Sequence, residues 1–247
     1  MADQMKFEFN TREDLRAPDK KRRLTRDLFT VIAPEYDHVT PLLSLGRDRS
    51  WKRALVSTLP DLAQPCCLAL ACGTGDLTFL LARRYPAGRI LGLDLAEKML
   101  ELARARNTYA NVSFVCADMT HTSQAAASVD LVTGGYALRN APELATALDE
   151  IARVLKPGGV AAFLDFSKPA SRPVQRLFYV LLTVWGGFWG LGLHGQPKVY
   201  TYIADTLRVY PDRPTLHRLL AARGLTVIQS RLHYAGLLET LLVRKAG

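Results

Sequence analysis

Several features that mark common protein classes are absent from this sequence of 247 residues. Its four cysteines (Cys66, Cys67, Cys72 and Cys116) show no zinc-binding spacing, so no metal site is predicted. Met1–Asn10 has no secretory pattern. No nucleic-acid-binding module is recognisable in the sequence, so we expect no nucleic-acid partner. Three of the cysteines lie in or beside an apolar run, where reduced thiols pack as small apolar groups. We therefore expect a cytoplasmic protein.

A complete dinucleotide fingerprint is also missing, although half of one is present. The apolar run Cys66–Ala71 predicts a buried strand, Gly73–Gly75 a turn, and Leu77–Tyr85 a helix. Glycines let a ligand approach the backbone, and the helix start offers free N–H groups. Thr78 or Phe79, depending on where the count starts, stands where a third glycine would be expected, which disfavours a pyrophosphate and hence a dinucleotide-dependent reductase. The pattern favours an adenosine ligand without phosphates, such as S-adenosylmethionine.

Acidic residues follow the next two predicted strands. Asp94 ends the strand Arg89–Leu93 and lies 21 residues after Gly73, where a carboxylate would hold a ribose diol. Asp118 follows the strand Val112–Cys116 and could accept a hydrogen bond from an adenine amino group. A helix cap or a turn is the plainer interpretation of either aspartate. Because ligands of open α/β sheets bind at the carboxyl edge, three successive strand ends with suitable groups favour a shared site.

Strands and helices alternate along the rest of the chain, which predicts an α/β fold with helices on both faces of a mostly parallel sheet. The closing strands are joined by a few residues and must be antiparallel to each other. We expect a helical arm and active-site cap over residues 1–52 and a main domain over 53–247, with an apolar lid inserted at about 170–200. The later strands are predicted at Val129–Thr133, Val160–Asp165, Leu225–Leu232 and Thr240–Lys245.

Two segments allow several interpretations. Lys20–Arg26 is the only tight basic cluster in a chain of net charge +9, and it could be a solvated helix face or could contact an anionic membrane surface or nucleic acid. Leu177–Leu193 contains 17 uncharged residues, slightly fewer than the ~20 of a spanning helix, and four glycines are expected to break its second half. It could cover an apolar ligand, dip into a bilayer surface, span a membrane or be buried.

Together these motifs resemble those of the ubiquinone/menaquinone biosynthesis C-methyltransferases, a family of class I S-adenosylmethionine-dependent methyltransferases. The resemblance extends from about Phe29 to Lys245, and it implies a Rossmann-like fold with a seven-stranded sheet whose last strand is antiparallel. It is carried by IAPEYD (Ile32–Asp37), SLGRDRSWK (Ser44–Lys52), GTGDL (Gly73–Leu77), GLDLAEKML (Gly92–Leu100), LRN (Leu138–Asn140), RVLKPGG (Arg153–Gly159), FSKP (Phe166–Pro169) and YTYIADTLRVYPD (Tyr200–Asp212).

The resemblance also implies a substrate and a set of site residues. The family methylates a ring carbon of a prenylated quinol and releases S-adenosylhomocysteine. Arg139 and Asn140 match a pair beside the quinol, and Tyr36 matches an aromatic cap over it. Arg139 is a poor base but could stabilise a phenolate or orient a water that carries the proton away. The cofactor is expected at Ala71, Gly73, Thr74, Gly75, Asp94, Leu95, Asp118, Met119 and Gly135.

The chain departs from the family pattern at a few positions. Ala69 replaces an acid in the first strand, Asp48 replaces a histidine, and Thr40 replaces an asparagine. The expected activity is methyl transfer to demethylmenaquinol or a polyprenyl benzoquinol. A methyltransferase for another lipophilic small molecule and a non-catalytic S-adenosylmethionine-binding relative are the alternatives. Peripheral contact with the inner face of an anionic membrane is expected, and a homodimer is one of the oligomeric states left open.

Overall fold

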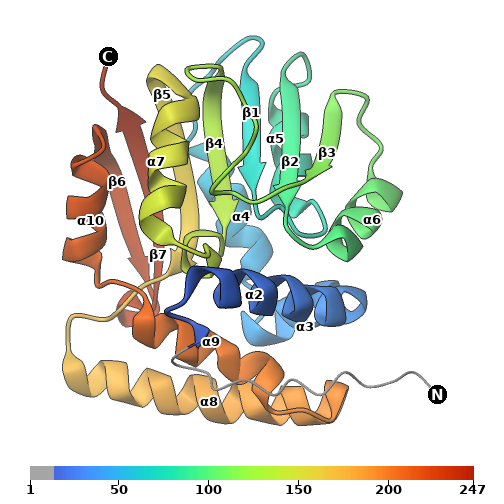
Figure 1. Cartoon of the computed structure of the whole chain (residues 1–247), viewed down its shortest axis with the longest axis vertical. Helices are drawn as coiled ribbons and strands as arrows, with labels where there is room; N and C mark the ends of the chain where they lie inside the picture. The colour runs from blue at the N-terminus through green and yellow to red at the C-terminus, as the bar shows by residue number, and fades with distance from the viewer. Residues whose placement is uncertain (1–13) are drawn as a thin grey trace.

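The computed structural model describes residues 14–247, so the first part of the predicted arm over residues 1–52 lies outside the described residues. A seven-stranded sheet with the order β3-β2-β1-β4-β5-β7-β6 forms its centre (Figure 1). The first five strands run parallel, and β7 is antiparallel to both β5 and β6. The strands are β1 (Cys66–Leu70), β2 (Arg89–Asp94), β3 (Val112–Cys116), β4 (Val129–Gly135), β5 (Leu155–Phe166), β6 (Leu225–His233) and β7 (Leu238–Lys245).

Helices cover both faces of this sheet because each presents an apolar stripe to it. Helices α4 (Asp48–Ser57) and α5 (Asp76–Arg84) pack one core with residues such as Leu55 and Leu81. Helices α7 (Leu144–Val154) and α10 (Arg213–Ala221) pack the core on the opposite face. Helix α6 (Glu97–Arg106) connects β2 to β3. The predicted α/β class I methyltransferase fold with an antiparallel last strand is confirmed.

Two N-terminal helices lie across the carboxyl ends of the parallel strands (Figure 1). Helix α2 (Pro18–Ile32) is amphipathic and buries Leu24 and Leu28. The segment after it contains prolines and other turn residues, yet it forms the short helix η1 (Ala33–Glu35) and then α3 (Tyr36–Leu43). Pro34 is tolerated because it lies in the first turn of η1, whereas Pro41 lies inside α3 and removes one of its backbone hydrogen bonds.

The apolar insertion forms one continuous helix, α8 (Arg172–His194), followed by α9 (Lys198–Val209). The expectation that glycines break the second half of this segment is therefore wrong. Gly186 and Gly190 instead allow close packing, since a Cβ on Gly186 would lie 2.8 Å from the Tyr200 oxygen, and one on Gly190 would lie 2.6 Å from the Gln196 oxygen. The two helices form a layer beyond α2 and α3, far from the amino ends of the strands (Figure 1).

Candidate functional site

The turn after β1 is bound to the end of β2. Gly73 and Gly75 have φ angles of +55° and +95°, which favour glycine. The Asp94 carboxylate accepts hydrogen bonds from the Gly73 N–H at 2.8 Å and from the Ala96 N–H at 2.9 Å. Burial raises the pKa of Asp94, although these backbone donors oppose the shift. The turn and the β2 carboxylate therefore form one rigid unit.

A small cavity of about 50 Å³ lies at this strand edge. Seven of the nine residues predicted to hold the cofactor line it, and Thr74 and Gly75 do not. Thr74 is buried and donates a hydrogen bond to Asp37, whereas Gly75 precedes the first turn of α5. The predicted residues that meet at the cavity are Ala71, Gly73, Asp94, Leu95, Asp118, Met119 and Gly135.

Helix α2 covers the far end of this small cavity through an ion pair that the sequence patterns did not indicate. The Asp118 carboxylate accepts hydrogen bonds from the Arg22 guanidinium and, at 2.8 Å, from the Thr120 N–H. Thr25 and Phe29 of the same helix line the cavity. The cavity is therefore small because α2 lies over the strand edge, where its Arg22 binds the Asp118 carboxylate that was predicted to contact adenine.

We expect replacement of Arg22 with glutamine to speed the association of S-adenosylhomocysteine. The Arg22–Asp118 ion pair must open before an adenine amino group can use the carboxylate. Since the Arg22 side chain is 39% exposed, the pair contributes at most about 1 kcal/mol, and the expected increase in association rate is about two- to fivefold. Stopped-flow binding would measure it, with Arg26→Gln as the control because Arg26 pairs with Asp27 on the surface. An unchanged rate for Arg22→Gln would show that the Arg22–Asp118 ion pair does not limit access of the ligand to Asp118.

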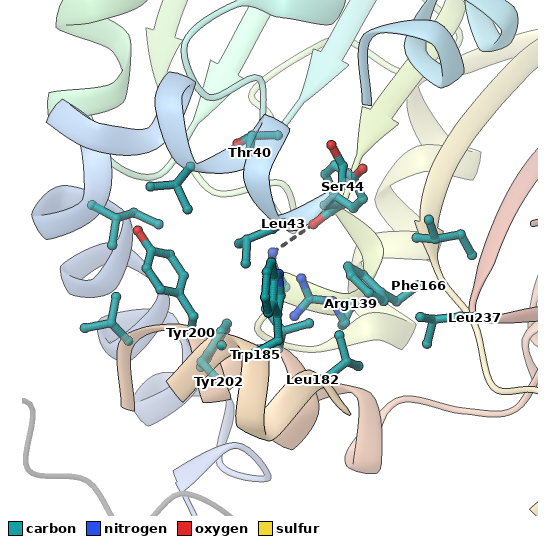
Figure 2. Close-up of a pocket in the computed structure, with 18 of the residues that line it drawn as sticks. Thr40, Leu43, Ser44, Arg139, Phe166, Leu182, Trp185, Tyr200, Tyr202 and Leu237 are labelled. Carbon is teal, nitrogen blue, oxygen red and sulfur yellow. Dashed lines mark hydrogen bonds between the residues drawn. The ribbon is translucent and has the colours of Figure 1, made fainter. Parts of the chain in front are cut away.

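A larger cavity of about 400 Å³ lies between the N-terminal helices and the α8–α9 layer. Its walls are almost entirely apolar, and Trp185 and Leu182 project into it from α8 while Tyr200 and Tyr202 project from α9 (Figure 2). Arg139 is the only Arg, Lys, His, Asp or Glu side chain that lines it among residues 14–247. A cavity of this kind suits an apolar ligand with one polar end.

Four residues line both cavities and therefore mark their junction: Phe29, Tyr36, Tyr136 and Asn140. Burial raises the pKa of Tyr36 to about 12, so its hydroxyl keeps its proton. The Asn140 amide donates to the Tyr136 carbonyl at 2.8 Å. The buried Asn140 Oδ1 has no hydrogen-bond partner among the described residues, so it can accept a hydrogen bond from a ligand.

Arg139 is buried at the polar end of the large cavity. Its Nη1 donates to the Thr206 hydroxyl, its Nε lies 3.8 Å from an Asp165 oxygen, and its guanidinium lies 5.0 Å from the centre of the Phe166 ring. Nε is buried and has no hydrogen-bond partner within residues 14–247. Burial and the neighbouring Arg139 charge lower the pKa of Lys21 to about 8, and its amine donates to the Arg139 carbonyl at 3.0 Å. This site thus offers positive charge and an unused donor.

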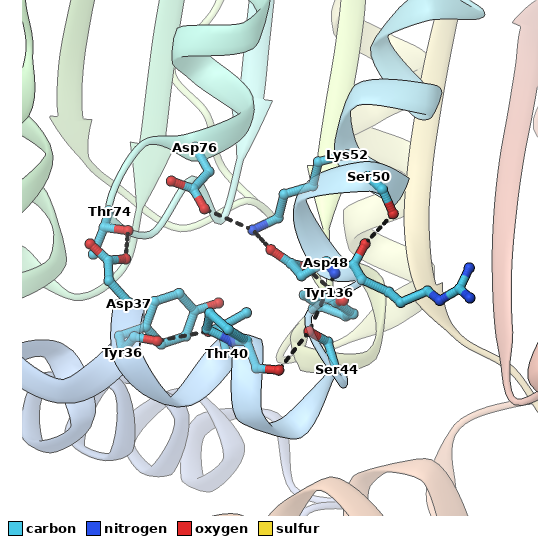
Figure 3. A network of polar contacts seen from close by, with 12 residues as sticks. Tyr36, Asp37, Thr40, Ser44, Asp48, Ser50, Lys52, Thr74, Asp76 and Tyr136 are labelled. Carbon is cyan, nitrogen blue, oxygen red and sulfur yellow. Dashed lines mark hydrogen bonds and ion pairs between the residues drawn. The ribbon is translucent and has the colours of Figure 1, made fainter.

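A buried polar network connects the junction to the glycine turn (Figure 3). The Tyr136 hydroxyl donates to Asp48 Oδ1 at 2.9 Å, and Lys52 Nζ contacts Asp48 at 2.7 Å and Asp76 at 3.1 Å. Burial alone would lower the pKa of Lys52, but the Asp48 and Asp76 carboxylates raise it overall. The network therefore keeps Lys52 charged and fixes α4 against the first turn of α5. In the sequence, Asp48 is recognisable only as a departure from the family pattern.

Ala69, the other main departure, does not line the small cavity. It lies in the apolar cluster that contains Leu77 and Leu81, and it is 1% exposed. Its register partner on β4 is Thr133, whose buried hydroxyl has no hydrogen-bond partner in the described part of the chain. The alanine thus fills a core position, and no other carboxylate takes its place on β1.

Comparison with known proteins agrees with this geometry. Residues 17–243 match the ubiE/COQ5 methyltransferase family. The chain is 30% identical to a demethylmenaquinone methyltransferase from Lactococcus lactis, over 90% of this chain and 89% of that protein. It is 36% identical to the ubiquinone/menaquinone biosynthesis C-methyltransferase UbiE from Geobacter sulfurreducens, over 85% of this chain and 83% of that protein.

A solved structure also shows the fold. It is that of an S-adenosylmethionine-dependent methyltransferase from Thermotoga maritima, which aligns with a TM-score of 0.63 at 16% identity. The alignment covers 90% of this chain and 99% of that chain. The family uses S-adenosylmethionine as its methyl donor. The chain described here thus belongs to the ubiE/COQ5 methyltransferase family and is an S-adenosylmethionine-dependent methyltransferase.

Proposed function

We propose that the enzyme methylates a ring carbon of a prenylated quinol, either demethylmenaquinol or a polyprenyl benzoquinol. The observation that carries this proposal is the apolar cavity of about 400 Å³, whose one polar end meets the strand edge at Tyr36, Tyr136 and Asn140. A quinol ring at this junction would leave its tail among the apolar side chains of α8 and α9. The names of the relatives support the same substrate class.

The residues at the strand edge fit S-adenosylmethionine. Asp94 lies within the cavity, and its oxygens have lone pairs left for ribose hydroxyls beyond the two backbone hydrogen bonds. At Gly73 a side chain would add a Cβ 3.8 Å from the Tyr36 ring, in the space between the turn and the cap. Asp118 can accept from an adenine amino group once Arg22 releases it. The bound cofactor would supply an electrophilic methyl group on a sulfonium.

The reaction requires a nucleophilic ring carbon aligned with that methyl group. The Arg139 guanidinium can stabilise the phenolate that forms when a quinol hydroxyl loses its proton. Asn140 Oδ1 can accept a hydrogen bond from the second hydroxyl and so fix the rotation of the ring. The bound cofactor would supply its methyl group to the ring carbon, which would then release its proton to a water that Arg139 can orient. The residues at the junction chiefly position the two reactants.

Transfer of a labelled methyl group tests the proposal. We expect the purified enzyme to label demethylmenaquinol and a short-tail polyprenyl benzoquinol, with at least one of them giving robust turnover. Quinol without a tail should react at least tenfold less efficiently in kcat/KM, because tail burial in the large cavity contributes about 0.8 kcal/mol for each CH₂ group.

Two results would contradict this proposal. Label on neither quinol, despite measured binding of S-adenosylhomocysteine, would reject the substrate class. Product masses from extracts of a host without its own quinone methylase would then reveal another lipophilic acceptor. A folded protein that fails to bind S-adenosylhomocysteine would indicate a non-catalytic relative.

A further inference from the structure

The outer face of α8 carries a row of exposed apolar side chains. Val184, Phe188 and Leu191 are between 60% and 66% exposed, and no charged residue lies between Arg176 and His194. By length and composition this helix could cross a membrane, yet only 11% of its most apolar window is buried. Helix α8 lies at the outer boundary of the fold, and no other described element covers this face (Figure 1). Such a continuous apolar surface marks an interaction site.

The opposite side of α8 forms a wall of the large cavity. Phe178, Leu182 and Trp185 line it, and Trp185 projects toward Arg139 (Figure 2). One helix therefore separates an exposed apolar surface from the space proposed for a prenyl tail. Lipid that contacts the outer face would lie a single helix away from that space.

The charges on the protein favour a bilayer surface over other occupants. Arg172 and Arg176 lie at the start of α8, and the whole chain has a net charge of +9. The basic cluster on α2 is partly used inside the protein, since Lys21 is buried against Arg139 and Arg22 pairs with Asp118. The other basic residues of that cluster, Lys20, Arg23 and Arg26, remain exposed on α2. The arginines of α8 remain at the edge of the apolar face, as in helices that lie in a membrane interface.

A second copy of the chain fits this face less well. Leu177, Leu181, Val184, Phe188 and Leu191 have the spacing of a coiled-coil seam. A coiled coil in water normally has charged residues flanking its seam, and here Leu177–Leu193 contains none.

Insertion of α8 across a membrane is also disfavoured. Gly186 and Gly190 hold α8 close to the backbone of α9, so the helix stays in the plane of the surface.

We propose that the outer face of α8 docks on a lipid bilayer with anionic headgroups and that the prenyl tail enters the large cavity along this helix. The tail route rests on the proposed function, whereas docking itself does not. The enzyme would then be a peripheral protein that takes its lipophilic substrate from the membrane.

Vesicle sedimentation tests the docking without any turnover. The full chain is mixed with vesicles of phosphatidylcholine and phosphatidylglycerol or of phosphatidylcholine alone. We expect partition into the anionic vesicles, with at least tenfold weaker partition for the triple variant Val184→Gln, Phe188→Gln, Leu191→Gln. These side chains do not line the cavity, so turnover of a detergent-dispersed quinol should stay unchanged. The matched control is Leu62→Gln, Ile228→Gln, Leu232→Gln, at side chains 40% to 46% exposed elsewhere.

Tryptophan fluorescence gives a second measurement. Trp185 and Trp189 lie on α8, and the third tryptophan, Trp51, is buried in the core at 7% exposure. Lipids with brominated tails should therefore quench the emission of the unaltered enzyme and leave that of the triple variant unchanged. Failure of the unaltered enzyme to sediment, or equal weakening in the control variant, would overturn the proposal. So would a solution dimer, seen by light scattering, that the triple variant dissociates without any vesicle binding.

Discussion

Replacement of Arg139 with glutamine is expected to lower kcat for methyl transfer by about 100- to 1,000-fold, the usual effect of removing a preorganised donor at a developing oxyanion. Arg139 is the only charged side chain that lines the large cavity within residues 14–247. Its Nε is buried without a hydrogen-bond partner there, so the donor is available for a ligand. Glutamine removes the positive charge that would stabilise a phenolate. Initial rates with labelled cofactor and saturating quinol measure the change.

Two further variants separate chemistry from folding. Arg139→Lys keeps the positive charge but loses the planar guanidinium, which can donate two parallel hydrogen bonds, so we expect a smaller loss in kcat, about tenfold. Thr206→Val removes the hydroxyl that accepts from Arg139 Nη1 and leaves the guanidinium in the cavity. It should lower stability by about 1 kcal/mol and change kcat only a few-fold. A folded Arg139→Gln enzyme with kcat within tenfold of the original would contradict the assigned role.

The sheet could be predicted from the sequence because local patterns determine it. The apolar run before Gly73 and the helical spacing after Gly75 predicted β1 and α5 to within a few residues. The parallel order then brings Gly73, Asp94 and Asp118 to one edge, where the structure places them around a single cavity. Site residues at the ends of parallel strands can therefore be predicted without knowledge of the side-chain packing.

The helical layer and the buried charges could not be predicted in the same way. Glycines in a helical run ordinarily weaken it, and only the contact of Gly186 and Gly190 with the α9 backbone explains why α8 continues. The Arg22–Asp118 pair joins residues 96 positions apart, and Tyr136–Asp48 joins residues 88 positions apart. Residue type alone does not indicate such partners, because an arginine on a helix usually faces solvent.

Replacement of Asp48 with alanine is expected to lower the free energy of unfolding by about 3–5 kcal/mol, since it leaves a buried ammonium group with too few partners. Asp48 is 3% exposed, contacts Lys52 at 2.7 Å and accepts from the Tyr136 hydroxyl at 2.9 Å. Asp76 alone would then face Lys52, and Asp76 is itself shared with Arg106. The thermal midpoint should fall by roughly 10 °C for a chain of this size. Urea unfolding and calorimetry would measure both changes.

A double-mutant cycle shows whether the loss comes from the pair. We expect Asp48→Ala combined with Lys52→Met to be less destabilising than the sum of the two single changes, because the double variant leaves no ammonium group buried. The control is Asp61→Ala, which removes a carboxylate that is 99% exposed and pairs with Arg84. Its effect should stay below about 1 kcal/mol. Additive losses at Asp48 and Lys52, or a change at Asp48 no larger than at Asp61, would show that this network does not hold α4 against the cofactor turn.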